Sequence, residues 1–435
     1  MRSGLLPLKR RLFSLFWGAG LVSDAGTWLQ LVTIGTLVAA DTGKATKTAL
    51  IAAATFAPQG IGSPFGGILA DRYDRRHVLL RTLGLQTLVT LVLTILLASG
   101  ERNANHLALV MLFQSAAGAL GQPSFQAIIP DLVPQHEVQA AVSLGLTSWN
   151  TGRVIGPALA GLFLVVGLGP AWAVGANALT FAVLWVAVLF ARRSFTPAAV
   201  PTDSVLGELR VGAQTLWKTP GCRMATFTYV FLHFTLIPFM GLIPKMALDV
   251  LGGTKRTVSV LTSAQGAAAI VAALAATSLL QRWSRSTLYV TFLGLSAGAS
   301  VLYVTSTGLT QATIGIAALG ASVSVIFAVV GGMLQRDAPA TKRGRVLSLN
   351  SAVSGSTYGL GLLVLGWLVD QWSMPAVFVI GAGIQAAAAV AFRSSKTLRS
   401  VVDGPTAAPR GDAGKASEAP FEAFEASPPA RLRLP

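Results

Sequence analysis

Two ionisable side chains lie inside long apolar stretches of the sequence. Asp24 stands near the middle of the stretch that begins at Phe13, and Arg153 stands near the middle of a later one. A charged group in a lipid bilayer costs about 2.5–3.5 kcal/mol on insertion scales, so such a residue is a candidate functional residue by default. A conformational step that separates a carboxylate from a guanidinium changes proton binding. We therefore predict proton coupling through Asp24 and Arg153, with a static charge pair that fixes helix register as the alternative.

Four further residues at membrane depth are candidates for contact with a substrate. Trp28 lies one turn beyond Asp24, Gln114 is an amide within an apolar run, and Phe231 and His233 belong to a segment rich in aromatic residues. A mixed aromatic and amide lining suits a large amphipathic ligand. The alternative is that the aromatic side chains face lipid or neighbouring helices, and that His233 is an ordinary core histidine.

The elements that must position these residues are membrane helices. The chain has 435 residues, of which 53% are hydrophobic and 11% charged, whereas a soluble globular protein has roughly 25% charged residues. A transmembrane helix needs about 20 mostly apolar residues, so the chain has room for about twelve. The apolar stretches fall into six before and six after a polar gap. We predict an all-α membrane protein with twelve transmembrane helices, and a soluble globular protein is excluded.

The predicted organisation has four parts. Residues 1–193 form the first six-helix bundle, 194–220 a cytoplasmic linker with an amphipathic helix, 221–395 the second six-helix bundle and 396–435 a disordered cytoplasmic tail. The two halves are related at an offset of 205 residues, which aligns Pro134 with Pro339, Ser143–Leu144 with Ser348–Leu349, Gly156 with Gly361 and Gly161 with Gly366. Two parallel repeats with a central site between them are typical of one class of transporter.

The net charge of +16 is distributed unevenly. The N-terminus, the alternate loops and the segment after the last helix carry most of the Lys and Arg residues, and the other side carries only Lys44, Lys47, Arg102, Lys255 and Arg256. Positive residues stay on the cytoplasmic side. We therefore expect both termini in the cytoplasm and a multi-pass protein of the cell inner (plasma) membrane. The charge is a topology signal, and nucleic acid is not an expected partner.

A short motif on the predicted cytoplasmic side joins the second and third helices. It runs from Gly67 through Asp71 and Arg72 to Arg75 and Arg76. A tight turn between helices needs a small residue at the approach and a carboxylate that pairs with cations or helix-end amides. The motif resembles the G-x-L-a-D-r-x-G-r-k signature of the major facilitator superfamily, with Asp74 where glycine is usual. The resemblance implies the major facilitator fold, with this motif as a conformational gate.

A second motif lies in the fifth predicted helix and contains Gly152, Gly156, Pro157 and Gly161. Small residues four apart let helix backbones approach closely, and ordinary close packing is the alternative reading. The motif resembles the G-x-x-x-G-P-x-x-G-G signature of superfamily antiporters, which marks exporters. Three more stretches, 23–30, 129–134 and 343–348, resemble the branch that contains enterobactin exporters and macrolide efflux proteins. Phe125 departs from that branch, which often has arginine at this place.

The resemblance implies a secondary active transporter that exports a siderophore or a drug-like compound, by proton antiport with alternating access. The alternatives are an uptake or facilitated-diffusion carrier of a nutrient and a non-transporting membrane receptor. No P-loop and no nucleophile–base set is present, so we expect neither an enzyme nor a cofactor, and no metal site. The expected partners are the substrate, protons and the lipid bilayer, and we expect a monomer.

Overall fold

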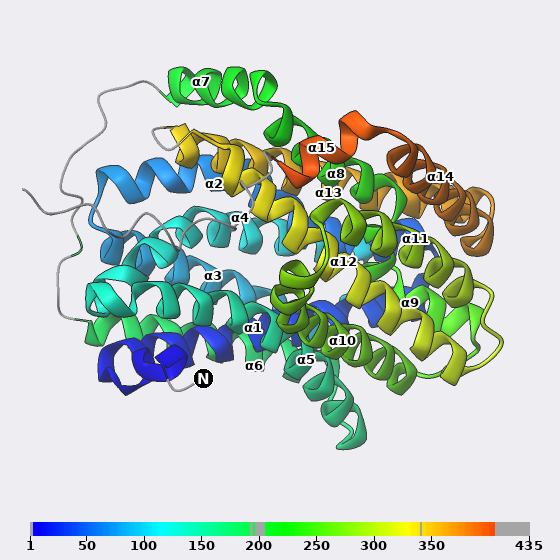
Figure 1. The fold of residues 1–435 in the computed structure, drawn as a ribbon. Coiled ribbons are helices and arrows are strands. Elements are labelled where there is room, and N and C mark those ends of the chain that lie inside the picture. The colour runs from blue at the N-terminus through cyan, green and yellow to red at the C-terminus, as the bar shows by residue number, and fades with distance from the viewer. Residues whose placement is uncertain (1–2, 192–194, 196–204, 340–341, 405–435) are drawn as a thin grey trace, which may run out of the picture.

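The structure is a computed structural model that describes residues 3–191, 195, 205–339 and 342–404. In these residues every regular element is helical (Figure 1). The first half contains η1 (Ser3–Lys9), α1 (Arg11–Thr42), α2 (Ala45–Arg72), α3 (Arg75–Ala98), α4 (Ala104–Ile128), η2 (Ile129–Leu132), η3 (Gln135–Glu137), α5 (Val138–Val165) and α6 (Pro170–Phe190). The expected all-α membrane protein is confirmed.

The second half begins with α7 (Val205–Lys218) at the edge of the molecule, where it packs on α13 (Figure 1). It continues with α8 (Pro220–Thr235), η4 (Ile237–Met240), α9 (Ile243–Lys245), η5 (Met246–Val250), α10 (Lys255–Arg282), α11 (Arg285–Val304), α12 (Leu309–Asp337), α13 (Arg343–Gln371), α14 (Met374–Ser394) and α15 (Lys396–Asp403). Residues 405–435 of the expected disordered tail lie outside the described residues.

The hydropathy of the helices divides them into two groups. Among the described residues, eight helices are long and apolar enough to cross a membrane: α1, α3, α6, α10, α11, α12, α13 and α14. Helices α2, α4 and α5 are also long, with 28, 25 and 28 residues, but they are rich in Ala, Gly, Ser and Thr. Small residues lower the hydropathy of a helix and at the same time let neighbouring backbones approach closely.

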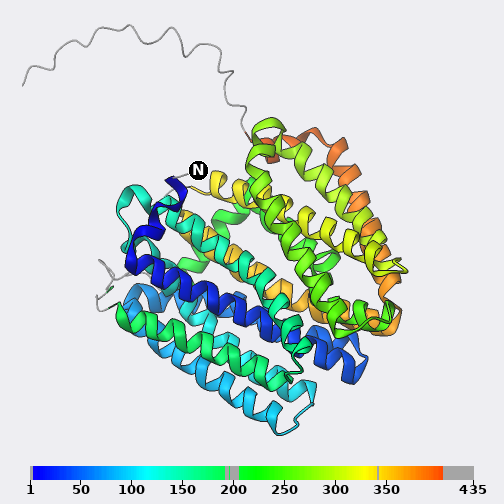
Figure 2. The ribbon, with the colours of Figure 1, turned by 90° about the horizontal axis from the view of Figure 1, so that it is seen from below.

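The helices form two bundles that lie side by side (Figure 2). In the first bundle α1 packs on α5 and α6, α2 on α4, and α3 on α4 and α6; in the second, α12 packs on α10 and α11, α14 on α11, and α13 on α8. The main contacts between bundles are α2 with α13 and α5 with α10. Two helices of each half therefore carry most of the interface.

The first apolar segment of the second half, from α8 to η5, is divided into short helices, and we call it the broken segment. Helix α8 ends at Thr235, and two prolines, Pro238 and Pro244, follow within the short elements η4 and α9. Proline has no backbone N–H, so the regular ladder cannot continue. The carbonyl of Thr235 instead accepts a bond from Gln385 Nε2 at 2.9 Å. A protein partner of this kind lets broken backbone persist at membrane depth.

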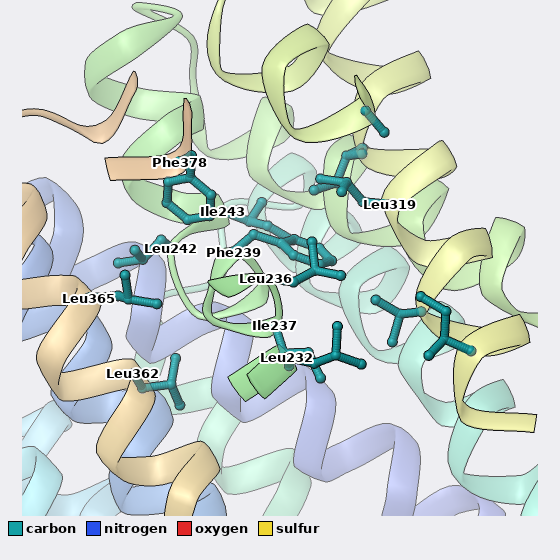
Figure 3. Close-up of a cluster of buried hydrophobic side chains, with 14 of the residues drawn as sticks. Leu232, Leu236, Ile237, Phe239, Leu242, Ile243, Leu319, Leu362, Leu365 and Phe378 are labelled. Atoms are coloured by element: carbon teal, nitrogen blue, oxygen red, sulfur yellow. The ribbon is translucent and has the colours of Figure 1, made fainter. Parts of the chain in front are cut away.

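The broken segment lies within a hydrophobic core that consists mainly of residues of the second half (Figure 3). Leu236, Phe239 and Leu242 are completely buried, and side chains of three neighbouring helices surround them. The residues that pack there from α12, α13 and α14 include Leu319, Leu362, Leu365 and Phe378. The interrupted helix is thus held rigidly by its neighbours.

One end of the molecule carries the α2–α3, α4–α5, α10–α11 and α12–α13 connections, and we call it the basic end. The buried residues of α2 and α13 are concentrated away from this end. Ten of the twelve buried residues of α2 lie between Ala45 and Gly60, and six of the eight of α13 lie between Gly359 and Val369. These two stretches face each other, since a Cβ on Gly359 would collide with Ala57 and one on Gly366 would collide with Ala49. The two halves are therefore joined in the part of the molecule away from the basic end.

Polar contacts close this opposite end. Asp370 of α13 accepts bonds from the backbone N–H groups of Ala45 and Thr46, at 2.7 and 2.8 Å. These are orphan amides of the first turn of α2, which has no side-chain cap of its own. Lys245 contacts the Gly43 carbonyl and Asp249 beside them. One half thus caps a helix of the other.

The chain beyond residue 395 differs from the expected tail at its start. Residues Lys396–Asp403 form α15, and the Arg336 side chain donates to its last carbonyls, at 2.9–3.0 Å for Val402 and Asp403. The Asp403 carboxylate in turn accepts from the backbone N–H and the hydroxyl of Ser286 at the start of α11. The composition of 396–403 is too polar to order alone, so these contacts with α11 and α12 stabilise the helix.

An ion pair at the basic end leads to a pH-dependent prediction. Arg10 donates to Glu137 with an Nη2–Oε1 distance of 2.6 Å, and this hydrogen bond and the arginine charge lower the pKa of Glu137. A lowered pKa stabilises the folded protein above the unfolded pKa of the carboxyl, and the stabilisation is lost as the pH falls below it. We expect Glu137→Gln to lower the Tm in detergent at pH 7 and to lower it less at pH 3, because wild type has already lost part of this stabilisation below the unfolded pKa. The control is Asp41→Asn, an exposed carboxylate, and an equal loss of Tm at both pH values would contradict the assignment.

Candidate functional site

The candidate site is built on the contact between α1 and α5. A Cβ on Gly152 would lie 2.8 Å from Asp24 Cβ, and one on Gly156 would lie 2.5 Å from Trp28 Cβ. Both distances are too short for any larger residue, so these glycines let the two backbones touch. The glycines of the antiporter-like motif therefore place Asp24 and Trp28 directly against α5.

The last glycine of the motif has a different neighbour. A Cβ on Gly161 would lie 3.3 Å from Ser259 Cβ in α10, which belongs to the second half. Pro157 is buried between these positions. The motif thus connects the two halves as well as two helices of one half.

Asp24 is bonded to a residue that sequence reasoning missed. The hydroxyl of Ser148 donates to Asp24 Oδ2 at 2.6 Å. Ser148 precedes Gly152 by four residues, so both lie on the face of α5 that meets α1. This spacing was the available signal, but serine is too common in helices to stand out.

Arg153 does not pair with Asp24 in this conformation. Its guanidinium lies over the Trp28 ring, 5.5 Å from the centroid, and its Nη2 is 3.0 Å from Met240 Sδ. Within the described part of the chain no ion pair involves Arg153, and its buried Nε has no hydrogen-bond partner. Because Gly152 packs against the backbone of Asp24, the next side chain extends past α1 toward the second half.

A row of aromatic rings crosses from one half to the other. Neighbouring centroids are 5.0–6.4 Å apart along the series Trp149, Trp28, Phe56, Tyr358, His233, Tyr229 and Phe327. The crossing is between Phe56 of α2 and Tyr358 of α13, at 5.1 Å. His233 is held by Thr357, with 2.9 Å between Nδ1 and Oγ1. Trp28, Phe56 and Met240 also line a small pocket between α1, α2 and the broken segment.

The four predicted substrate contacts separate into two groups. Trp28 and His233 belong to the aromatic row, whereas Gln114 and Phe231 do not. Gln114 accepts a bond from Gln30 at 2.7 Å, and Asn177 donates to the other end of the Gln30 amide at 2.7 Å. This chain of amides lies inside the first bundle and occupies the Gln114 carbonyl oxygen. Phe231 packs against the hydrophobic core of the second half.

Phe56 and Tyr358 are site residues that the sequence did not single out. Each lies in a long helix among many apolar residues, and neither belongs to a motif. Their importance depends on the packing of α2 against α13, and no local pattern reports that contact.

The gate motif makes its described contacts within the first half. Arg75 Nη1 lies 3.3 Å from Asp131 Oδ2 and donates to the Ala127 carbonyl, and Arg76 donates to the last carbonyls of α6. Asp74 caps α3 by accepting from the Arg76 N–H at 2.8 Å, which accounts for an aspartate at this place. Asp71 and Arg72 are exposed, and a Cβ on Gly67 would meet no described atom within 4 Å.

Comparison with known proteins agrees with this architecture. Residues 2–406 match the family described as transmembrane secretion effector, within the major facilitator superfamily. The chain belongs to this family. It is therefore a transporter of the superfamily and not an enzyme.

The relatives are distant. The chain is 24% identical over 382 residues to the multidrug efflux pump Tap of Mycolicibacterium fortuitum, covering 85% of this chain and 92% of that protein. It is 21% identical to the macrolide efflux protein A of Streptococcus pyogenes, over 82% and 89% of the two chains. The crystal structure of a mutant of the nucleoside transporter NupG superimposes with a TM-score of 0.72 at 13% identity, over 88% of this chain and 99% of that one. This last likeness concerns the fold alone.

The α1–α5 contact gives a prediction for stability. Gly156→Leu would force α5 away from Trp28, and we expect a loss of about 2 kcal/mol or more, as for overpacked cores. The measurement is the Tm of the purified protein in detergent, together with its transport rate. Gly298→Leu is the matched control, because Gly298 is exposed and a Cβ there meets no described atom within 4 Å. An unchanged Tm for Gly156→Leu would refute the close contact.

Proposed function

We propose that this transporter exports a small amphipathic organic molecule, of the siderophore or drug-like class, by proton antiport with alternating access. The observation that carries the proposal is the position of Asp24 at the α1–α5 contact, one turn from the aromatic row that joins the halves. A carboxyl group there can respond both to the arrangement of the halves and to a ligand between them.

The proposed topology has twelve spans in the inner membrane, with both termini in the cytoplasm. The spans are the eight apolar helices together with α2, α4, α5 and the broken segment from α8 to η5. Support comes from the basic end, where Arg10, Arg75, Arg76, Arg285 and Arg336 lie with α15. Since positive residues stay on the cytoplasmic side, the basic end is cytoplasmic.

On this topology the conformation is an inward-open state. The halves are joined near the outer face through Asp370, Lys245 and the glycines of α2 and α13. Burial on both α2 and α13 falls toward the cytoplasm. Transport then requires the outer contacts to break while the cytoplasmic ends approach each other. The gate motif with Gly67, where a Cβ would meet no described atom, is the surface available for that closure.

Asp24 is the proposed proton carrier. It is partly buried and has Ser148 as its hydrogen-bond donor, and the described residues offer it no ion pair. A carboxyl group without a cation partner exchanges its proton when its access to water changes. The same residue is therefore able to couple the position of the halves to the proton gradient.

Asp24→Asn tests the coupling. Cells that express wild type are expected to retain less of a fluorescent efflux substrate or labelled siderophore, and a protonophore should remove this effect. We expect Asp24→Asn to reduce export at least tenfold, because an amide cannot carry the proton. Asp41→Asn, which removes an exposed aspartate of the same helix, should export normally. Normal export by Asp24→Asn, or by wild type without a gradient, would disprove proton coupling through this residue.

Asp370→Ala tests the conformational cycle. Without its carboxylate the first turn of α2 loses the cap that ties it to α13, so we expect the outer end to open more often. The measurement is labelling from outside by an impermeant maleimide of Ala52→Cys, a buried position in the pocket, with the native Cys222 replaced by serine. Labelling should be faster in Asp370→Ala and unchanged in Asp41→Ala. Equal rates in all three proteins would show that Asp370 does not hold the outer end closed.

A further inference from the structure

We infer that the substrate carries an anionic group, such as a carboxylate, and that Arg153 binds it at the junction of the two halves. The inference rests on the proposed function, because it names the chemical class of the molecule transported through the same central site.

The first argument is the charge balance around Arg153. The guanidinium lies at the interface, since the Gly266 backbone of α10 packs against the Arg153 carbonyl and Met240 of the broken segment contacts Nη2. In the described part of the chain no carboxylate pairs with it. The Met240 thioether is a weak acceptor, and the Trp28 ring offers a cation–π contact. Neither group neutralises the charge of the guanidinium, so Arg153 is available to form an ion pair with an anionic ligand.

The second argument is the supply of unused donors. The indole N–H of Trp28, the Nε of Arg153 and the hydroxyl of Tyr358 are all buried without a hydrogen-bond partner among the described residues. Trp28 is only 4% exposed and lines the pocket between the halves. The Tyr358 ring belongs to the same aromatic row, with its centroid 5.1 Å from that of Phe56. Unpaired buried donors are costly, so each of these donors is available to an acceptor oxygen of an anionic ligand.

The third argument concerns the rest of the ligand. Trp28 presents its ring face beside the guanidinium, and the rings of Phe56 and Tyr358 follow it in the aromatic row. A planar apolar body suits these faces, and an anionic group at its edge reaches Arg153. A cationic body would instead meet the guanidinium and be repelled. The site therefore selects an aromatic or otherwise flat organic acid over the corresponding neutral or cationic compound.

The test compares three probes that share one ring system: 2-naphthoate, its methyl ester and 2-naphthylmethylamine. Binding to the purified full chain in detergent is measured by calorimetry, with no gradient. We expect the acid to bind at least tenfold more tightly than the ester, because a hydrogen bond to a charged group is lost in the ester. The amine should bind more weakly than the ester.

Variants connect this preference to the residue. Arg153→Met should remove the difference between acid and ester, and Arg153→Lys should keep part of it. Arg102→Met, which removes an exposed arginine outside the site, should bind all three probes as wild type does. The comparison of probes on wild type remains decisive if Arg153→Met does not fold. Tight binding of the ester or the amine, absence of saturable binding of the acid, or an unchanged preference in Arg153→Met would each overturn the inference.

Failure of this inference is distinguishable from failure of the proposed function. If the amine binds best while Asp24→Asn still abolishes export, the anion site is wrong and proton-coupled export stands. If the acid binds through Arg153 but export needs no gradient, the site stands and the coupling is wrong.

Discussion

The architecture of this transporter depends on one close backbone contact, between α1 and α5. Gly152 and Gly156 let the helices touch at Asp24 and Trp28. In lipid, two helices gain little from burying apolar side chains, so packing of backbones and small residues becomes the main attraction. A larger residue at either glycine would separate the helices and change the position of every functional group on them. The backbone contact therefore sets the positions of the side chains of the site, and their polar interactions depend on those positions.

The position of Arg153 follows from that contact. With Gly152 against α1, the next side chain leaves the α1–α5 face and extends toward the second half, where it meets Met240. The carboxylate of Asp24 stays on the contact face and bonds to Ser148. Two charges that look like partners in the sequence are thus given separate neighbours, and they can serve separate roles for proton and ligand.

The interactions between the two halves can break without leaving buried polar groups unpaired. At the end opposite the basic end, Asp370 caps a helix of the other half with hydrogen bonds, and Lys245 contacts the Gly43 carbonyl. Both are near the water interface, where water can replace them when they break. Deep in the membrane the contact is between the backbones of Gly60 and Gly355 and between aromatic rings, which can slide without leaving a polar group unpaired. An interface of this kind is suited to two arrangements of similar free energy.

The sequence by itself determined the helical class, the two halves and the motif glycines, because apolar length and small-residue spacing are local patterns that membrane insertion requires. It also indicated Asp24, Arg153, Trp28 and His233 as candidates, since rare polar groups at membrane depth are visible without a structure.

Tertiary structure decided which of these residues meet. It assigned Ser148 to Asp24, drew Gln114 into an internal amide network, and brought Phe56 together with Tyr358. It also ordered Lys396–Asp403 through Arg336. These outcomes depend on contacts between segments far apart in the chain. Local composition carries no record of such contacts, because a helix of given sequence can present its polar groups to any neighbour that packs closely enough.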